Sequence, residues 1–234
     1  MTDIKDSYII GAYWGSRAEP LSNVVDKIFH TLNELKEIDV QFLKYYELGM
    51  SRKKALENEV TLNKENVKKI CLSSVKKGEL DENGIAKLGF VLWVWTGHKD
   101  EESSSVNFTV GGTYKTKNIS NLCVLKIPHE GAARERMLQG GISKKILDLI
   151  VSTWNPDYAV LTSDSLRDQL NVGNEWGWIT YRRMISHIPD LGDSITYEKD
   201  VQGHWFYVNS IGHFAGNVIE DLSKLSKDIS NGSK

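Results

Sequence analysis

The stretch YIIGAYWGSR, from Tyr8 to Arg17, is the segment around which the rest of the chain can be placed. Its β-branched and aromatic residues favour a pleated, half-buried surface, so the stretch predicts a core strand. The glycines within it allow a close approach of the backbone or unusual dihedral angles. Tyr13, Trp14 and Arg17 come at the end of this strand, and we expect them to lie at an edge of the fold. We expect this group to lock the first strand to the first helix.

An amphipathic helix follows the strand directly. Apolar residues recur from Leu21 to Leu35 at the i, i+3, i+4, i+7 spacing of a helix that packs on a core. Pro20 suits the first turn, where a missing N–H costs nothing. Further helices are expected over 51–60, 63–75 and 142–154, in a short segment at 163–170, and near the C-terminus.

The middle and the end of the chain are predicted to contain strands. They are expected over 88–96, 106–113, 122–127, 158–162, 177–184, 194–198 and 205–209, with 42–46 a strand or an irregular edge. The run at 88–96 is apolar at nearly every position, which predicts a strand covered on both faces. The fold class is therefore α+β, a single domain over 1–234 with a mostly antiparallel β-sheet and helices packed against it. We expect its core to span about 8–225 and its tail at 230–234 to be frayed.

Composition and charge restrict the possible partners. The chain has 234 residues, with 29 basic and 31 acidic side chains and a formal net charge of -2. This balance lacks the basic footprint of a nucleic-acid-binding protein, so we expect no direct nucleic-acid partner. The polar N-terminus MTDIKDS has no apolar signal region, and no run approaches the length of a membrane span. We infer a cytoplasmic protein without a membrane partner, and its oligomeric state stays open.

The sequence contains little that supports a catalytic function. The six histidines show no metal-ligand spacing, no GxSxG motif occurs, and we expect Cys71 and Cys123 to be buried and inert. Gly140-Gly141 lies between a strand and a helix, as does the pyrophosphate loop of acyl-CoA-dependent N-acetyltransferases, but the residues from Arg136 onward miss that loop's spacing. We therefore assign no catalytic, cofactor-binding or metal-ligating residue. A small acyl-CoA-dependent transferase-like enzyme is the alternative, and it requires a deep pocket near these glycines.

Tryptophan is unusually frequent. The seven tryptophans fill the core and its corners, or some of them anchor a protein interface, where this residue type is enriched. Trp176 and Trp178 flank Gly177, so in an extended strand one should point inward and the other outward or to an edge. Trp176 is accordingly one of the candidate partner-binding residues.

Several motifs in order resemble the immunity protein 52 family of bacterial polymorphic toxin systems. They are YIIGAYWGSR, the GMSR at 49–52, the LGF and WTG around 88–97, the WNPD at 154–157, the GWITY at 177–181, and a turn at Gly203 before the last strand and helix. The resemblance covers roughly residues 8–225. The recurrent family positions that we expect to hold the fold are Tyr13, Trp14, Arg17, Gly89, Gly97, Trp154, Pro156, Gly177, Trp178 and Tyr181.

The resemblance implies a non-enzymatic antidote that binds and neutralises a cognate toxin, often one delivered by a secretion system such as type VI. It also implies that this toxin carries a restriction-endonuclease-like nuclease domain. A regulatory domain with another protein partner stays open as a further alternative.

Acidic loops supply a physical route to inhibition, because carboxylates can occupy the places of DNA phosphates in a basic groove. The candidate elements are Glu79, Asp81 and Glu82 in one loop and Asp100, Glu101 and Glu102 in another. We favour Asp100 to Glu102, because this loop lies between two predicted core strands.

Overall fold

The computed structural model describes residues 6–76, 78–113, 121–170, 175–188, 190–209, 211–212 and 217–231. Its strands are β1 (Tyr8–Trp14), β2 (Tyr46–Glu47), β3 (Phe90–Trp95), β4 (Ser105–Val110), β5 (Asn121–Lys126), β6 (Tyr158–Ser163), β7 (Ile179–Arg182), β8 (Ile195–Lys199) and β9 (His204–Val208). Its α-helices are α1 (Leu21–Ile38), α2 (Arg52–Leu56), α3 (Lys64–Ser73), α4 (Ala132–Leu138), α5 (Gly141–Trp154), α6 (Asp164–Leu170) and α7 (Val218–Asn231), with short 3₁₀ turns η1 (Val40–Phe42) and η2 (Asp100–Glu102).

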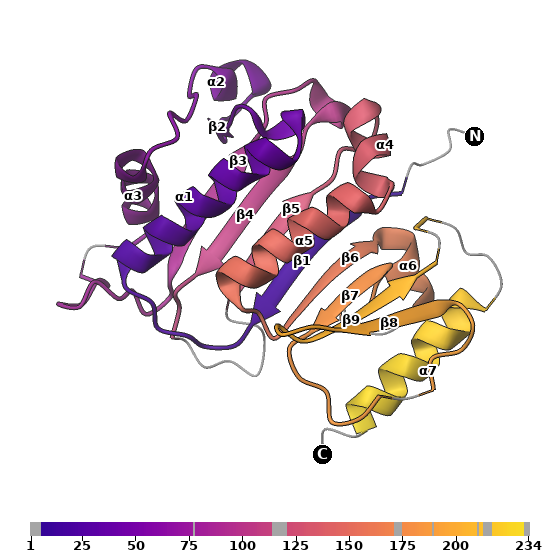
Figure 1. Cartoon of the computed structure of the whole chain (residues 1–234). Coiled ribbons are helices and arrows are strands. Elements are labelled where there is room, and N and C mark those ends of the chain that lie inside the picture. The colour runs from indigo at the N-terminus through magenta and orange to yellow at the C-terminus, as the bar shows by residue number, and fades with distance from the viewer. Residues whose placement is uncertain are drawn as a thin grey trace.

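The strands of the described residues form one continuous nine-stranded sheet in the order β2-β3-β4-β5-β1-β6-β7-β9-β8 (Figure 1). Every pairing in it is antiparallel. The predicted α+β arrangement, with helices packed on a mostly antiparallel sheet, is thereby confirmed. The predicted frayed tail falls largely outside the described residues, and α7 runs into its beginning, to Asn231.

The first strand lies in the middle of this sheet. β1 pairs with β5 on one side and with β6 on the other, and Ala12 lies opposite Cys123 and Ala159. Alternate side chains of β1, among them Ile10 and Trp14, are buried in the main core. The opening stretch is therefore the central core strand that its composition predicts.

The end of β1 is locked to α5, whereas we expected it to be locked to α1. The Trp14 and Trp154 rings stack with their centroids 5.6 Å apart. Arg17 donates from Nη1 to the carbonyl oxygen of Trp154 at 2.6 Å and from Nη2 to that of Asn155 at 2.8 Å. The expected partner is wrong because the last carbonyls of α5 lack partners within the helix and attract a cation. α1 joins indirectly, since Trp154 Nε1 donates to Thr31 Oγ1 at 3.1 Å.

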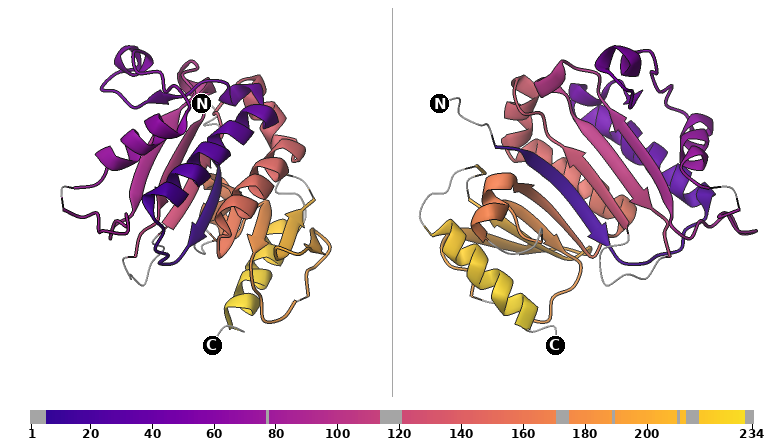
Figure 2. Two further views of the ribbon diagram at one scale, coloured as in Figure 1. Left: turned by 60° about the vertical axis from the view of Figure 1, so that its left-hand side comes forward. Right: turned by 180° about the vertical axis from the view of Figure 1, so that it is seen from behind.

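Helices cover opposite faces in the two halves of the sheet. α1, α3 and α5 pack over the half that contains β1 and β3, and α6 and α7 pack on β6 and β8. The right-hand view of Figure 2 shows the sheet from behind, with α1 and α5 beyond the strands and α7 in front of the second half. Strands β1, β5, β4 and β3 face the viewer there with no helix over them.

The strand predicted to be covered on both faces is covered on one only. β3 alternates between buried and exposed residues, and Val91 and Trp93 are 41% and 48% exposed. The prediction was wrong because exposed apolar residues produce the same unbroken apolar run as a doubly buried strand.

The described helices include no candidate for a membrane-crossing segment.

Candidate interaction surfaces

The bare side of the first half of the sheet is a feature that the sequence did not predict. We call it the open face, and it consists of the residues of β1 to β5 that point away from α1 and α5. Registered rows run across it, such as Trp93, Asn107 and Val124 on neighbouring strands. Its members are Ile9, Gly11, Tyr13, Tyr46, Val91, Trp93, Trp95, Ser105, Asn107, Thr109, Leu122, Val124 and Lys126.

Exposure on the open face increases toward β3. At its inner border Tyr13 is buried and stacks on Tyr158 of β6, with the ring centroids 5.0 Å apart. At the other border the Trp95 ring lies 5.9 Å from the Tyr46 ring, and its Nε1 donates to the carbonyl oxygen of Glu47 at 3.2 Å. Trp93, between these borders, is half exposed. A large, half-exposed aromatic side chain of this kind is typical of the anchor residues of protein interfaces.

The two predicted acidic loops lie at opposite ends of α1. At its start, the Leu21 N–H donates to the carbonyl oxygen of Gly84 at 2.8 Å. Beyond its end, Gln41 Nε2 donates to the carbonyl oxygen of Glu102 at 2.7 Å. Since α1 has 18 residues, the loops are separated by roughly 27 Å along the helix. They do not form one acidic patch.

The loop at Glu79, Asp81 and Glu82 uses part of its charge locally. Asp81 Oδ1 accepts hydrogen bonds from the N–H groups of Asn83 at 2.9 Å and Ile85 at 2.7 Å, which holds a turn. Glu79 Oε2 accepts from the N–H of Lys76 at 3.4 Å. Glu82 lines a pocket of about 490 Å³ between α1 and α3, whose wall also carries lysines.

The loop at Asp100, Glu101 and Glu102 forms η2, and its Glu102 side chain lies in the wall of a hollow. Glu102 lines a pocket of about 290 Å³ together with His98, Glu130 and Arg136. The carbonyl oxygen of Glu101 accepts hydrogen bonds from the N–H groups of His129 and Glu130. These bonds hold the segment after β5 against η2. The side chain of Asp100 lies outside the described part of the structure.

Asp39 and Arg136 form a bidentate ion pair at the edge of this hollow. Arg136 Nε donates to Oδ2 and its Nη2 to Oδ1, both at 2.8 Å, and the Gln41 N–H donates to Oδ1 at the same distance. Burial would raise the pKa of Asp39, but the hydrogen bonds from Arg136 and Gln41 outweigh it and hold the pKa below its usual value. The pair fixes α4 against the end of α1.

Asp39→Asn is expected to lower the free energy of unfolding by roughly 1–2 kcal/mol at pH 7, because it removes hydrogen bonds to a charged group whose partner is partly exposed. Since the pKa is depressed in the folded state, this stabilisation is present above about pH 4 and is lost as the pH falls through the folded-state value. Chemical unfolding at pH 7 and pH 3 tests this. The gap between variant and wild type should shrink at pH 3, and an equal gap at both would contradict the ion-pair account.

Trp176 is not an exposed anchor, contrary to prediction. It is 1% exposed, with its ring edge-on to Phe206 at 5.4 Å and the Arg182 guanidinium 4.8 Å above it. Trp178 is also buried, so the expectation that one of the two points outward is wrong. The alternation of an extended strand does not apply, because β7 begins only at Ile179.

The residues predicted to hold the fold lie mostly in the core. Tyr13, Trp14, Trp154, Pro156, Trp178 and Tyr181 are buried. Gly97 and Gly89 have positive φ, and Cβ atoms there would meet the Tyr46 ring and the Val110 carbonyl oxygen. The placement fits a structural role for this set.

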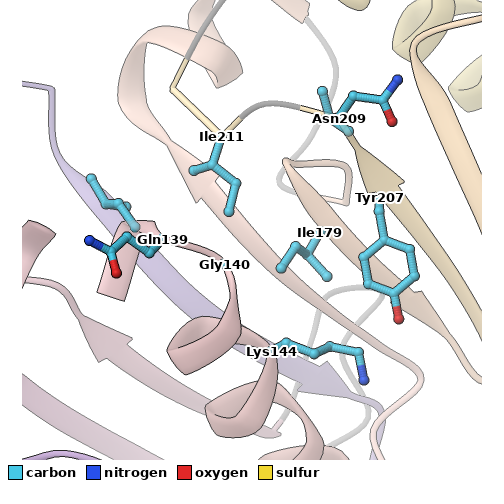
Figure 3. A pocket seen from close by; sticks show the side chains of 9 residues that line it. Gln139, Gly140, Lys144, Ile179, Tyr207, Asn209 and Ile211 are labelled. Carbon is cyan, nitrogen blue, oxygen red and sulfur yellow. The ribbon is translucent and has the colours of Figure 1, made fainter. Parts of the chain in front are cut away.

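A pocket of about 290 Å³ lies beside Gly140, where the transferase alternative requires one. Figure 3 shows Lys144 and Tyr207 on the wall of this pocket. The Lys144 ammonium pairs with Asp148 and lies 4.0 Å from the centre of the Trp205 ring. The volume is at the lower end for small-ligand pockets, well short of what a coenzyme A ester would fill.

The cysteines are buried, as predicted. Burial raises the pKa of the Cys71 thiol to about 12 and that of Cys123 further, so neither offers a thiolate nucleophile at neutral pH. Among the described residues, no three His, Cys, Asp or Glu side chains gather closely enough to hold a metal ion.

Comparisons with known proteins give one family and a structural likeness. The family model described as Immunity protein 52 matches residues 6–203. A solved structure described as a Pseudomonas aeruginosa T6SS protein is 11% identical, with a TM-score of 0.56 over 97% of this chain and 76% of that chain. At this identity the likeness shows a shared fold. No curated protein sequence matches the chain significantly.

Proposed function

The chain belongs to the immunity protein 52 family, and we propose that it binds a cognate toxin with a restriction-endonuclease-like nuclease domain and neutralises it. The observation that carries this proposal is the family match, which runs from before β1 to the turn that precedes β9. Membership of this family directly supports an immunity role. The nuclease identity of the toxin rests on what the family resemblance implies. Because such a toxin cuts DNA, the cytoplasm is the place of action that the proposal requires.

Occlusion of the DNA-binding groove is the mechanism that we propose. A nuclease holds DNA in a groove lined with cations, and carboxylates presented by a protein can take the places of the phosphates. Of the two acidic loops, we favour η2, because it connects two strands of the sheet. The carboxylates of the other loop are partly engaged in holding its own turn.

Purified components test the function. The toxin domain encoded beside the gene for this chain is mixed with the chain, and complex formation is followed by size-exclusion chromatography while DNA cleavage is titrated. We expect a co-eluting complex and stoichiometric loss of cleavage. Cleavage that continues at a large excess of the chain, with no complex, would remove the proposal.

Charge reversal tests the role of η2. The double variant Glu101→Lys, Glu102→Lys should slow association with the toxin about tenfold or more at low salt, and the matched variant Glu79→Lys, Glu82→Lys should leave the rate nearly unchanged. Equal rates for the two variants would contradict a specific role for η2.

The transferase alternative has its own test. Acyl-CoA binding to the folded chain would raise the melting temperature by mass action. We expect no shift with acetyl-CoA or a longer acyl-CoA, and a saturable shift would favour the enzyme instead.

A further inference from the structure

We propose that the open face is the docking surface for the toxin and that it takes an apolar protein surface carrying a carboxylate opposite Lys126. This inference rests on the proposed function and deepens it, because it places the main contact on the sheet rather than on an acidic loop. The feature behind it is a five-stranded surface that is apolar outside Lys126 and the polar positions of β4, and that no described helix covers (Figure 2).

The exposed apolar side chains of this face are neighbours in space. Val91 and Trp93 lie two residues apart on β3, and their rows continue through Thr109 and Asn107 to Leu122 and Val124 on β5. Leu122 and Val124 are only partly buried. The polar side chains of Thr109 and Asn107 lie between these two apolar groups. Exposed apolar groups this close together mark interaction sites, and a half-exposed tryptophan among smaller side chains is the usual form of a hot spot.

The size of the open face argues against a second copy of this chain as its occupant. Four strands spaced by about 4.8 Å, each near 20 Å long, together with the two-residue β2, give a surface of roughly 400 Å². Stable interfaces bury about 800 Å² on each partner. Two open faces packed on each other would therefore reach only half of what a stable dimer needs.

The charge of the open face also argues against a second copy of this chain as its occupant. Among the described outward-facing positions of β1 to β5, Lys126 is the only charged residue, and its register neighbours are Ser105 and Ile9. The strand positions of a second copy's open face would offer this ammonium no carboxylate, and burying a cation without a counter-ion is costly. The occupant must bring the carboxylate itself, and a nuclease has acidic residues at its metal centre.

The open face continues into the acidic loop that the proposed function uses. η2 belongs to the connection between Trp95 at the end of β3 and Ser105 at the start of β4. Those two residues and Lys126 form one row of the sheet. A toxin docked on the open face therefore reaches the end of the sheet at which this loop begins. The Glu102 side chain lies beyond that end, in the hollow beside Arg136. A toxin that extends around this end meets apolar surface and a carboxylate together, and gains the interface area that the face alone lacks.

Affinity for the toxin tests the inference. We would use the neighbouring gene's toxin domain with its carboxylates intact, kept inactive by chelating the divalent metal, and measure Kd by calorimetry. Trp93→Ala should weaken binding at least about 30-fold, the loss typical of a hot spot, and Lys126→Glu should weaken it about tenfold or more. The matched control is Met184→Ala, an 81% exposed apolar residue in the loop after β7, which should bind as wild type does. Melting temperatures of all three variants should stay near that of the wild type, because the altered side chains are exposed or half exposed.

The outcomes separate the two proposals. If the wild type binds the toxin and both open-face variants bind it equally well, the docking surface lies elsewhere and only this inference is overturned. If the wild type alone sediments as a dimer that Trp93→Ala dissociates, a second copy covers the face and the inference is again overturned. If the wild type does not bind the toxin, the proposed function fails, and this inference fails with it.

Discussion

Trp14→Ala is expected to lower the free energy of unfolding by about 3–5 kcal/mol, the range for removing a large buried aromatic side chain. Trp14 is 1% exposed, stacks on Trp154, and lies beneath the Arg17 guanidinium at 5.7 Å. Its loss opens a cavity where the central strand, α5 and the arginine meet. Urea unfolding followed by circular dichroism measures the effect.

The control for this variant is Trp14→Phe. The indole N–H of Trp14 is buried without a hydrogen-bond partner, so phenylalanine loses volume but no hydrogen bond. We expect a loss well below that of the alanine variant. In the fraction that stays folded, Trp14→Ala should bind the toxin as the wild type does. An unchanged unfolding midpoint together with lost toxin binding would instead make the end of β1 the interface.

Gly177→Ala is the second variant with a large expected effect, about 3 kcal/mol or more. A Cβ at this position would lie 2.1 Å from the carbonyl oxygen of Leu161 and 2.5 Å from Val160 Cγ2. The same carbonyl accepts a hydrogen bond from the Trp178 N–H at 2.8 Å. The backbone is therefore pressed onto β6, and a methyl group has to push the two segments apart.

Gly141→Ala is the matched control for Gly177→Ala. A Cβ at Gly141 would meet nothing within 4 Å. This glycine begins α5, where alanine is the better helix former. We expect equal or slightly higher stability for this variant in thermal unfolding. If both alanine variants unfolded at the same temperature, close packing at Gly177 would not be what requires glycine there.

The local sequence pattern correctly predicted those helices and strands that bury one side against the core. The apolar repeat of α1 and the strand-forming composition of β1 each led to the right element, because a core face imposes a period that the sequence displays. The antiparallel pairing of β3, β4 and β5 followed from the order of three consecutive strands in the middle of the chain. The burial of Cys71 and Cys123 followed from the apolar surroundings in which they occur.

The local sequence pattern could not predict which faces and loops lie near one another in the folded chain. The run at β3 is apolar on both sides of the strand, and an open face that binds a partner looks the same in sequence as a face covered by a helix. Trp176 and Trp178 were assigned to opposite faces by an alternation that holds only within a strand. The distance between the two acidic loops depends on α1 lying between them, which no local pattern states.

The carbonyl partners of Arg17 were equally hidden. The lock on β1 is made by the end of α5, more than a hundred residues later in the chain. A cation at a strand end gives no sign of which helix terminus it will meet. Only the strand order, with β1 between β5 and β6, brings the two together.

The decisive test of the proposed immunity role is the growth of bacteria that produce the neighbouring toxin domain, with and without this chain. We expect the toxin alone to stop growth and damage DNA, and co-production of the chain to restore growth and intact DNA. Growth that stays arrested while the folded chain accumulates in excess over the toxin would contradict it.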